Sequence, residues 1–193
     1  MKKEDKRSRK TVKAIQDALL SMLAEYSLSD IKIIELCRRA DINRTTFYLH
    51  YENVDEVQRS IREGMVERIF EKYKSESFLY TLEHPLDFLV VCIEVITSYE
   101  GFENFVRRSA EAPYFLEELK KAFVSRAYAE YTNQSLNKND YAFYILHFMT
   151  AGTFDTFIVW LRSDKSVPLS SILDRCAKML SSGYEALLNT SDA

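Results

Sequence analysis

The chain has 193 residues and a formal net charge of −3, and 47% of its residues are hydrophobic. That hydrophobic share is enough for a buried core, and the negative net charge excludes a protein that is basic throughout. Only four Gly and three Pro occur in the whole chain. This scarcity predicts an all-α fold, because sheets require many turns.

The first predicted helix runs from about residue 9 to residue 26. Its apolar residues recur at intervals of three and four, which is typical of an amphipathic helix that packs on its neighbours. Residues 1–8 are basic, and we expect either a mobile arm that reaches DNA or a solvated tail. Arg9 and Lys10 begin the helix, where positive charge opposes the helix dipole. DNA phosphate nearby would explain these two residues.

Two short helices joined by a tight turn are predicted over residues 31–51. The first helix has one apolar face that extends from Ile33 to Ala40. Asp41, in the turn, tolerates a left-handed backbone better than most residues other than glycine. Asn43 is a good N-cap for the second helix, because its side chain can accept from the first backbone N–H groups.

The second of these helices is predicted to lie against DNA. Phe47 and Tyr51 are four residues apart and can face the core together. Among the outward residues, Arg can bond guanine edges, Thr can use its hydroxyl or its methyl group, and Tyr, Thr and His can donate to phosphate. An ordinary pair of bundle helices with a solvated polar face is the alternative, since such pairs are common by chance. The outward residues are Arg44, Thr45, Thr46, Tyr48 and His50.

This segment resembles the N-terminal DNA-binding domain of the tetracycline-repressor (TetR) family of bacterial transcription regulators. Residues 40–48, ADINRTTFY, match the family's Ala-Gly-Val/Ile-x-x-x-Thr-Phe-Tyr signature, and Tyr51 follows where Phe or Tyr is usual. The resemblance is specific over about residues 9–57 and weak afterwards. It implies a helix-turn-helix domain over residues 1–53 and a helical effector-binding and dimerisation domain over residues 54–193.

Three positions differ from what is common in the family. Asp41 stands where Gly is typical, and Lys32 stands where a phosphate-bonding Thr is frequent but can still supply charge. Val54 replaces a Lys that opens the next helix in many members and touches phosphate. From the family pattern we expect residue 54 to face the DNA backbone.

Charge and apolar runs separate the N-terminal segment from the rest of the chain. Residues 1–51 carry more Lys and Arg than Asp and Glu, and the remainder carries more acidic residues than basic ones. This fits a DNA-binding domain joined to a second domain.

The N-terminus is charged and the longest apolar run, residues 88–96, is short, so we expect no signal peptide and no membrane span. Three widely spaced cysteines favour reduced thiols in a cytoplasmic protein without a disulfide or a metal site.

The rest of the chain is expected to be helical. An apolar stripe predicts a long helix over residues 54–74, and residues 140–162 form a helix that is apolar nearly all round. A partner subunit is therefore expected to cover part of it. The resemblance implies that this helix and the last one, which starts at Pro168, pair with their copies in a homodimer. Further helices are expected at 85–99, 102–110 and 113–131. The residues assigned to dimerisation are Gly152, Thr156, Trp160, Met179 and Tyr184.

Enzymatic activity has little support in the sequence. It contains no Gly-rich phosphate loop, no His-Glu-x-x-His, no Gly-x-Ser-x-Gly and no paired cysteines. We therefore expect neither an enzyme nor a cofactor. Twelve Tyr and twelve Phe could line a ligand pocket through their ring faces, although core packing is the simpler explanation for most of them. The resemblance implies an effector cavity, for which the candidate residues are Glu94, Phe105, His147 and Asp155.

Together these features predict a homodimeric, sequence-specific DNA-binding transcriptional regulator. We expect a repressor that binds a near-palindromic double-stranded operator and that a small-molecule effector releases or alters. The alternative is a TetR-fold coactivator or protein-interaction module with weak DNA binding, which the missing Lys at residue 54 favours. The expected DNA contacts are Arg9, Lys10, Lys32, Arg44, Thr45, Thr46, Tyr48 and His50.

Overall fold

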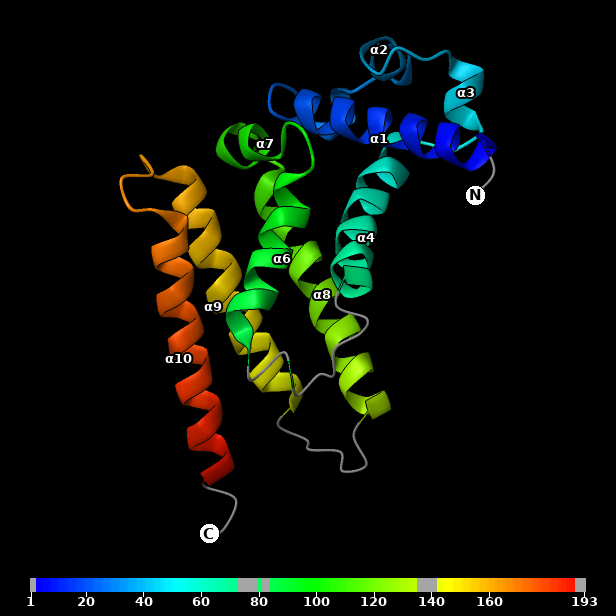
Figure 1. The fold of residues 1–193 in the computed structure, drawn as a ribbon. Helices are drawn as coiled ribbons and strands as arrows, with labels where there is room; N and C mark the ends of the chain where they lie inside the picture. The colour runs from blue at the N-terminus through cyan, green and yellow to red at the C-terminus, as the bar shows by residue number, and fades with distance from the viewer. Residues whose placement is uncertain (1–2, 73–79, 81–83, 135–141, 190–193) are drawn as a thin grey trace. The chain divides into compact units, whose positions relative to one another are not determined.

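The computed structural model describes residues 3–72, 80, 84–134 and 142–189, and each element within these ranges is helical (Figure 1). The predicted all-α fold is confirmed. The N-terminal elements are α1 (Lys3–Leu23), the 3-10 helix η1 (Leu28–Asp30), α2 (Ile33–Arg39), α3 (Arg44–Tyr48) and α4 (Val54–Lys72). The later elements are α6 (Pro85–Thr97), α7 (Phe102–Arg108), α8 (Ala112–Gln134), α9 (Ala142–Arg162) and α10 (Leu169–Asn189).

The chain divides into two compact units. The first unit comprises residues 1–65 and 96–118, and the second comprises residues 66–95 and 119–193. The first unit therefore combines the predicted DNA-binding segment with α7 and with the beginnings of α4 and α8. The domain boundary expected after residue 53 stays a prediction.

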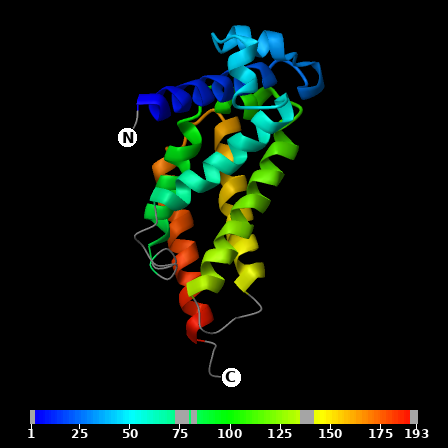
Figure 2. The same ribbon diagram turned by 90° about the vertical axis from the view of Figure 1, so that its right-hand side faces the viewer.

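The core of the first unit is built on the apolar face of α1. Ile15, Leu19 and Leu23 are almost completely buried, because their spacing places them on one side of the helix. Both α2 and α7 pack against α1. In two perpendicular views α2 and α3 lie on the same side of α1 (Figures 1 and 2). Phe105 and Phe115 add a buried edge-to-face pair with ring centroids 5.1 Å apart.

The start of α1 corrects one expectation from the sequence. We expected residues 1–8 to form an arm or a tail, but α1 begins at Lys3. Lys, Arg and Glu are good helix formers, so the helix can extend through this basic stretch without an apolar face. Arg9 consequently lies beyond the first turn, and the expected conflict with the helix dipole does not arise there. Residues 1 and 2 lie outside the described residues.

The bend between α6 and α7 packs closely on α1. Gly101 has φ +84°, and a Cβ atom at this position would lie 3.2 Å from the backbone nitrogen of Ser21. Left-handed backbone and close approach both favour glycine at this bend. The backbone N–H of Glu100 donates to Oδ1 of Asp17 on α1 over 3.1 Å. These contacts join α1 to α7 within the first unit.

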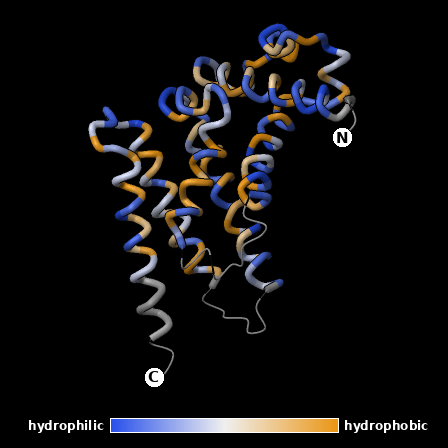
Figure 3. The backbone as a smooth tube through the Cα atoms, viewed as in Figure 1, coloured by the Kyte–Doolittle hydropathy of each residue, from blue (hydrophilic) through white to orange (hydrophobic). Residues whose placement is uncertain are grey.

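The second unit contains α9 and α10, which lie side by side and run in opposite directions (Figure 1). Over the coloured part of α10 in Figure 3, hydrophilic and hydrophobic residues both recur along the helix, as expected for an amphipathic helix. Its buried residues Leu173 and Ala177 pack with Leu89 of α6. Trp160, near the end of α9, fixes the connection to α10 because its indole N–H donates to the carbonyl of Val167 over 2.9 Å.

Candidate DNA-binding surface

The turn between α2 and α3 has the geometry that the sequence predicted. Asp41 adopts a left-handed conformation with φ 54°, and the N–H of Ile42 donates to the carbonyl of Cys37 over 3.0 Å. Asn43 then caps α3, because its Oδ1 accepts from the N–H of Thr46 over 2.7 Å. Both the turn and the cap are confirmed, and they fix where α3 starts.

The inner face of α3 is anchored by aromatic side chains. Phe47 is completely buried, and Tyr51, just after the helix, is 7% exposed. Their ring centroids lie 6.0 Å apart. Leu36 and Cys37 of α2 are buried as well. The predicted inward orientation of Phe47 and Tyr51 is confirmed, and it determines which side chains of α3 point outward.

A small polar network ties Tyr51 to α1 and α4. The side-chain amide of Gln16 donates to the hydroxyls of Ser60 and Tyr51 over 3.1 and 3.3 Å. The two hydroxyl oxygens lie 3.0 Å apart. Burial raises the pKa of the Tyr51 phenol, so the phenol stays protonated at neutral pH. The segment that follows α3 is thereby joined to both neighbouring helices.

The outward face of α3 lies opposite Phe47. At about 100° per residue, Thr45 and Leu49 fall about 200° from Phe47 in either direction, and both are exposed. Leu49 continues the helical backbone, with φ −73° and ψ −16°. Arg44 and Tyr48 are exposed on one flank of this face. The two other side chains that were predicted to point outward, Thr46 and His50, are half-buried.

Arg44 and Tyr48 contact each other along this flank. A guanidinium N–H of Arg44 donates to the Tyr48 hydroxyl over 3.4 Å, and the guanidinium carbon lies 5.8 Å from the ring centroid. Within the described residues no carboxylate pairs with Arg44. The Arg44 charge is therefore positioned on the helix without being neutralised.

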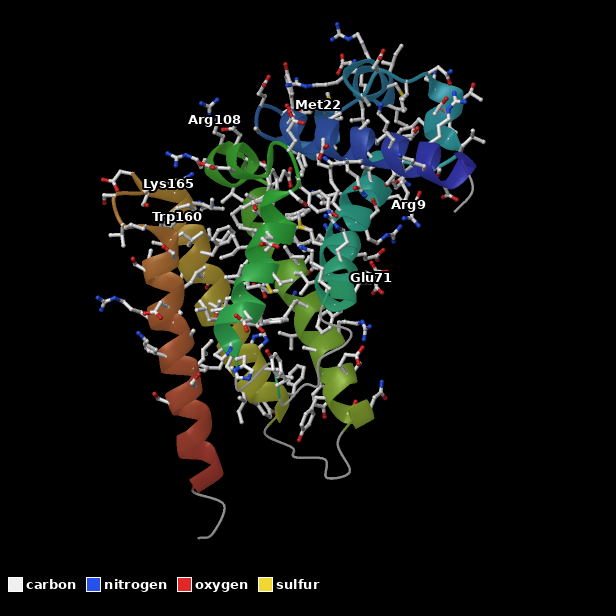
Figure 4. The ribbon with its side chains drawn as sticks, viewed as in Figure 1. Arg9, Met22, Glu71, Arg108, Trp160 and Lys165 are labelled. Atoms are coloured by element: carbon white, nitrogen blue, oxygen red, sulfur yellow. The ribbon has the colours of Figure 1, made fainter. Side chains whose placement is uncertain are left out.

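The three other predicted basic contacts lie outside α3. Lys32 is exposed at the N-cap position of α2 and makes no side-chain cap. Lys10 is exposed on α1. Arg9 is seven residues before Gln16 and shares its face of α1; Figure 4 shows Arg9 on the side of α1 nearer to α4. DNA contact by these three residues stays a prediction.

A known protein is similar to this chain in sequence. None of the protein-family models compared with the chain matches it. The chain is 29% identical over 150 residues to the uncharacterized HTH-type transcriptional regulator YxbF of Bacillus subtilis strain 168. This match covers 75% of the chain but 38% of YxbF, so the chain spans well under half the length of this relative.

The structural comparison is more extensive. The crystal structure of a TetR transcriptional regulator from Streptococcus agalactiae 2603V matches with a TM-score of 0.58 and 19% sequence identity, over 92% of this chain and 97% of that chain. This chain has the TetR fold. The resemblance carried by residues 40–48 is thus confirmed at the level of the fold.

Val54 departs from the expectation that the TetR signature raised. We expected its side chain to face the DNA backbone, but Val54 is 7% exposed and lies in the core of the first unit. Burying an apolar side chain at the start of α4 is favourable, and Asn53 caps the helix by accepting from the N–H of Glu56 over 2.8 Å. The expectation was therefore wrong. The exposed residues beside Val54 are acidic, namely Glu52 and Asp55.

The four candidate effector residues belong to two different compact units. Phe105 is completely buried and belongs to the first unit, whereas the other three belong to the second. Glu94 pairs with Lys72 over 2.9 Å, and Asp155 pairs with Lys120 over 3.2 Å. His147 is exposed on α9 and stacks on the ring of Phe143. Their effector-binding role stays a prediction.

The candidate dimerisation residues occupy the two helices expected from the TetR resemblance. Gly152 is exposed and Met179 is 75% exposed. Thr156 and Trp160 are half-buried and bond within their own chain, to the carbonyls of Gly152 and Val167. Tyr184 lies in α10, and its side chain is outside what the structure describes. Large apolar side chains on the exposed part of α9 are Tyr144, Phe148 and Val159.

Sequence reasoning missed two exposed apolar residues of the helix-turn-helix. Leu49 is 76% exposed at the end of α3, and Ile34 is 61% exposed on α2. The spacing of two residues between Phe47 and Leu49 already places Leu49 on the outward side.

Other kinds of site find no support in the part of the chain that the structure describes. No three His, Cys, Asp or Glu side chains gather there as a metal site would require. None of the described helices has the length and apolar character needed to cross a membrane. The cysteines Cys37, Cys92 and Cys176 are free thiols, and burial raises the pKa of Cys37.

Proposed function

We propose that this protein is a sequence-specific DNA-binding transcriptional regulator that uses α3 as its recognition helix. The observation that carries the proposal is the exposed surface of α3, where Thr45 lies opposite the buried Phe47 and Arg44 and Tyr48 lie on one flank. A helix of this kind fits the major groove, in which the edges of the base pairs can be distinguished. The names of YxbF and of the S. agalactiae regulator support the same function.

In this proposal the outward residues have separate roles. Arg44 bonds a guanine edge, because a guanidinium presents two parallel donors to O6 and N7. Tyr48 accepts from Arg44, which leaves its own hydroxyl proton for a phosphate oxygen. Phosphate contacts fix the register of the helix but carry no sequence information. Lys32, exposed at the start of α2, adds a further phosphate contact.

The test of this function is selection from a pool of random DNA duplexes with the full-length protein. Enrichment of one near-palindromic sequence is expected, since two symmetric subunits would each read one half-site. Failure to enrich any sequence over several rounds would refute the proposal.

The proposal includes a homodimer formed through α9 and α10. Tyr144, Phe148 and Val159 are each at least 69% exposed in the single chain. Clusters of large exposed apolar side chains mark interaction surfaces more often than solvated ones. Gly152 lies among them, and a Cβ atom there would have no neighbour within 4 Å. A second copy of the chain could therefore approach closely at this point.

We further propose that the regulator acts as a repressor and that a small molecule in its helical body releases or alters DNA binding. The family resemblance supports this part of the proposal. Titration of a DNA complex with candidate ligands tests it, and ligand binding that leaves the DNA affinity unchanged would contradict it.

A TetR-fold coactivator or protein-interaction module is the second candidate function. One specific observation favours it: the exposed residues Glu52 and Asp55, which follow α3 in the chain, are acidic. Acidic side chains close to a phosphate backbone weaken binding. The selection experiment separates the two candidates, because a coactivator of this kind would enrich no DNA sequence.

A further inference from the structure

Leu49 is the most exposed apolar residue of the helix-turn-helix segment. It is 76% exposed, and its backbone N–H donates to the carbonyl of Thr45 over 3.2 Å. A single exposed Leu is ordinary on a protein surface. Leu49 differs from such a residue because it lies on the outward face of α3.

Leu49 and Thr45 project at the middle of the recognition face. They lie one helical turn apart, each about 200° from the buried Phe47. Arg44 and Tyr48 lie to one side and contact each other. When α3 enters a major groove with Phe47 facing the protein, Thr45 and Leu49 therefore point most directly at the base edges.

The chemistry of the groove determines what a leucine can read there. Its side chain has neither donor nor acceptor, so it cannot satisfy the polar edges of guanine, adenine or cytosine. The thymine 5-methyl group is the apolar feature of the major groove. We propose that Leu49 is a specificity-determining residue that packs against a thymine methyl group in each half-site. This inference rests on the proposed DNA-binding function and goes further by naming the base.

The test removes only that methyl group. Duplexes enriched by the full-length protein are resynthesised with each thymine replaced in turn by deoxyuridine, which lacks the 5-methyl group but pairs identically. At one thymine of each half-site the replacement is expected to weaken binding by about fourfold, the effect of one buried methyl group. Leu49→Ala should bind the thymine and uracil duplexes with nearly equal affinity, because its methyl contact is gone.

Two control variants separate this role from a general effect. Leu49→Met keeps an apolar side chain of similar volume and should retain the preference for thymine. Tyr114, on α8, is 61% exposed. Tyr114→Ala removes a large exposed side chain outside the recognition helix and should leave the thymine-to-uracil ratio unchanged. Circular dichroism should show all three variants folded, since the replaced side chains are mostly in solvent.

The outcomes distinguish this inference from the proposed function. Sequence-specific binding that no uracil replacement weakens would overturn the role of Leu49 but would still support the proposed function. A uracil penalty that persists unchanged in Leu49→Ala would assign the methyl contact to another residue and also overturn it. If no DNA sequence is enriched at all, the proposed function fails and this inference fails with it.

Discussion

Asn43 fixes the start of α3 through one short hydrogen bond. Its Oδ1 accepts from the N–H of Thr46 over 2.7 Å, a donor that would otherwise have no partner in the helix. Asn43→Ala should lower the free energy of unfolding by about 1 kcal/mol. Asn43→Asp retains the acceptor and should stay close to the unmodified protein. Chemical denaturation measures both variants, and equal losses would show that the cap contributes nothing.

Tyr51 stabilises the first unit through its hydroxyl as well as its ring. Tyr51→Phe keeps the ring beside Phe47 but leaves Gln16 and Ser60 without their shared partner. A loss of about 1–2 kcal/mol in unfolding free energy is expected. Tyr48→Phe is the matched control, because Tyr48 is 51% exposed, and it should change stability little. Denaturation curves in which the two variants coincide would contradict the role given to the network.

The pH dependence of this stabilisation has a definite sign. Burial raises the pKa of Tyr51 above its ordinary value of 10.0. The protonated phenol therefore stabilises the native state fully below that value, and its contribution is lost as pH rises through the higher pKa of the folded protein. The stability difference between the unmodified protein and Tyr51→Phe should shrink above pH 10. Urea denaturation at several alkaline pH values measures it, and a difference that grows with pH would be inconsistent with this account.

Arg44 and Tyr48 should affect DNA binding in different ways. Arg44→Ala should cost about 1–3 kcal/mol on the preferred sequence and relax the preference at one base pair. Tyr48→Phe should weaken binding to all sequences alike, because its hydroxyl is assigned to phosphate. The two residues touch, so a double variant is needed to measure their coupling. Fluorescence anisotropy measures the affinity of both variants for preferred and scrambled duplexes. Reversed patterns would mean that the roles of Arg44 and Tyr48 are exchanged.

At the scale of elements, the joint between α1 and the α6–α7 bend depends on Gly101. Its φ of +84° and the backbone of Ser21 at 3.2 Å from an added Cβ both disfavour any side chain. Gly101→Ala should destabilise the protein by about 1–3 kcal/mol. Gly152→Ala, in open space on α9 of the single chain, should not destabilise the subunit itself, so it is compared at a protein concentration too low for a dimer to form. Thermal unfolding of the two variants tests this, and a Gly101→Ala variant as stable as the parent would not agree with it.

The elements were predictable from the sequence where a local pattern determines them. The turn at Asp41, the cap at Asn43 and the inward Phe47 follow from residue types at fixed spacing. The start of α1 was missed because residues 3–8 have no apolar period, although they are good helix formers. Local patterns are least informative where no periodic signal exists.

Packing between distant segments could not be read from the sequence. Residues 96–118 join the same compact unit as the helix-turn-helix, yet no periodicity says which helices pack together. Phe105 is one example, because its completely buried position beside Phe115 in the first unit has no signal in the sequence. The expectation for Val54 was wrong because a family pattern gives a residue's usual role but not its burial in this chain.

At the scale of the whole molecule, the dimer proposal depends on the exposed face of α9. Gly152→Leu would place a large side chain where the single chain offers no neighbour within 4 Å. The subunit should therefore remain folded while a close contact with a second copy is blocked. We expect the dissociation constant of the dimer to rise at least tenfold, which corresponds to about 1.4 kcal/mol. Analytical ultracentrifugation measures it, and a parent protein that is monomeric at micromolar concentration would refute the dimer itself.

The central claim is that the outward face of α3 reads a DNA sequence. The most direct measurement is the ratio of dissociation constants for a scrambled duplex and for the duplex enriched by selection, at about 0.15 M salt. A specific regulator should prefer its own site by about a thousandfold or more. Arg44→Ala should reduce this ratio by about tenfold or more, because it removes a base contact. A ratio near one for the unmodified protein, or a large ratio that Arg44→Ala, Thr45→Ala and Leu49→Ala all leave unchanged, would contradict the account.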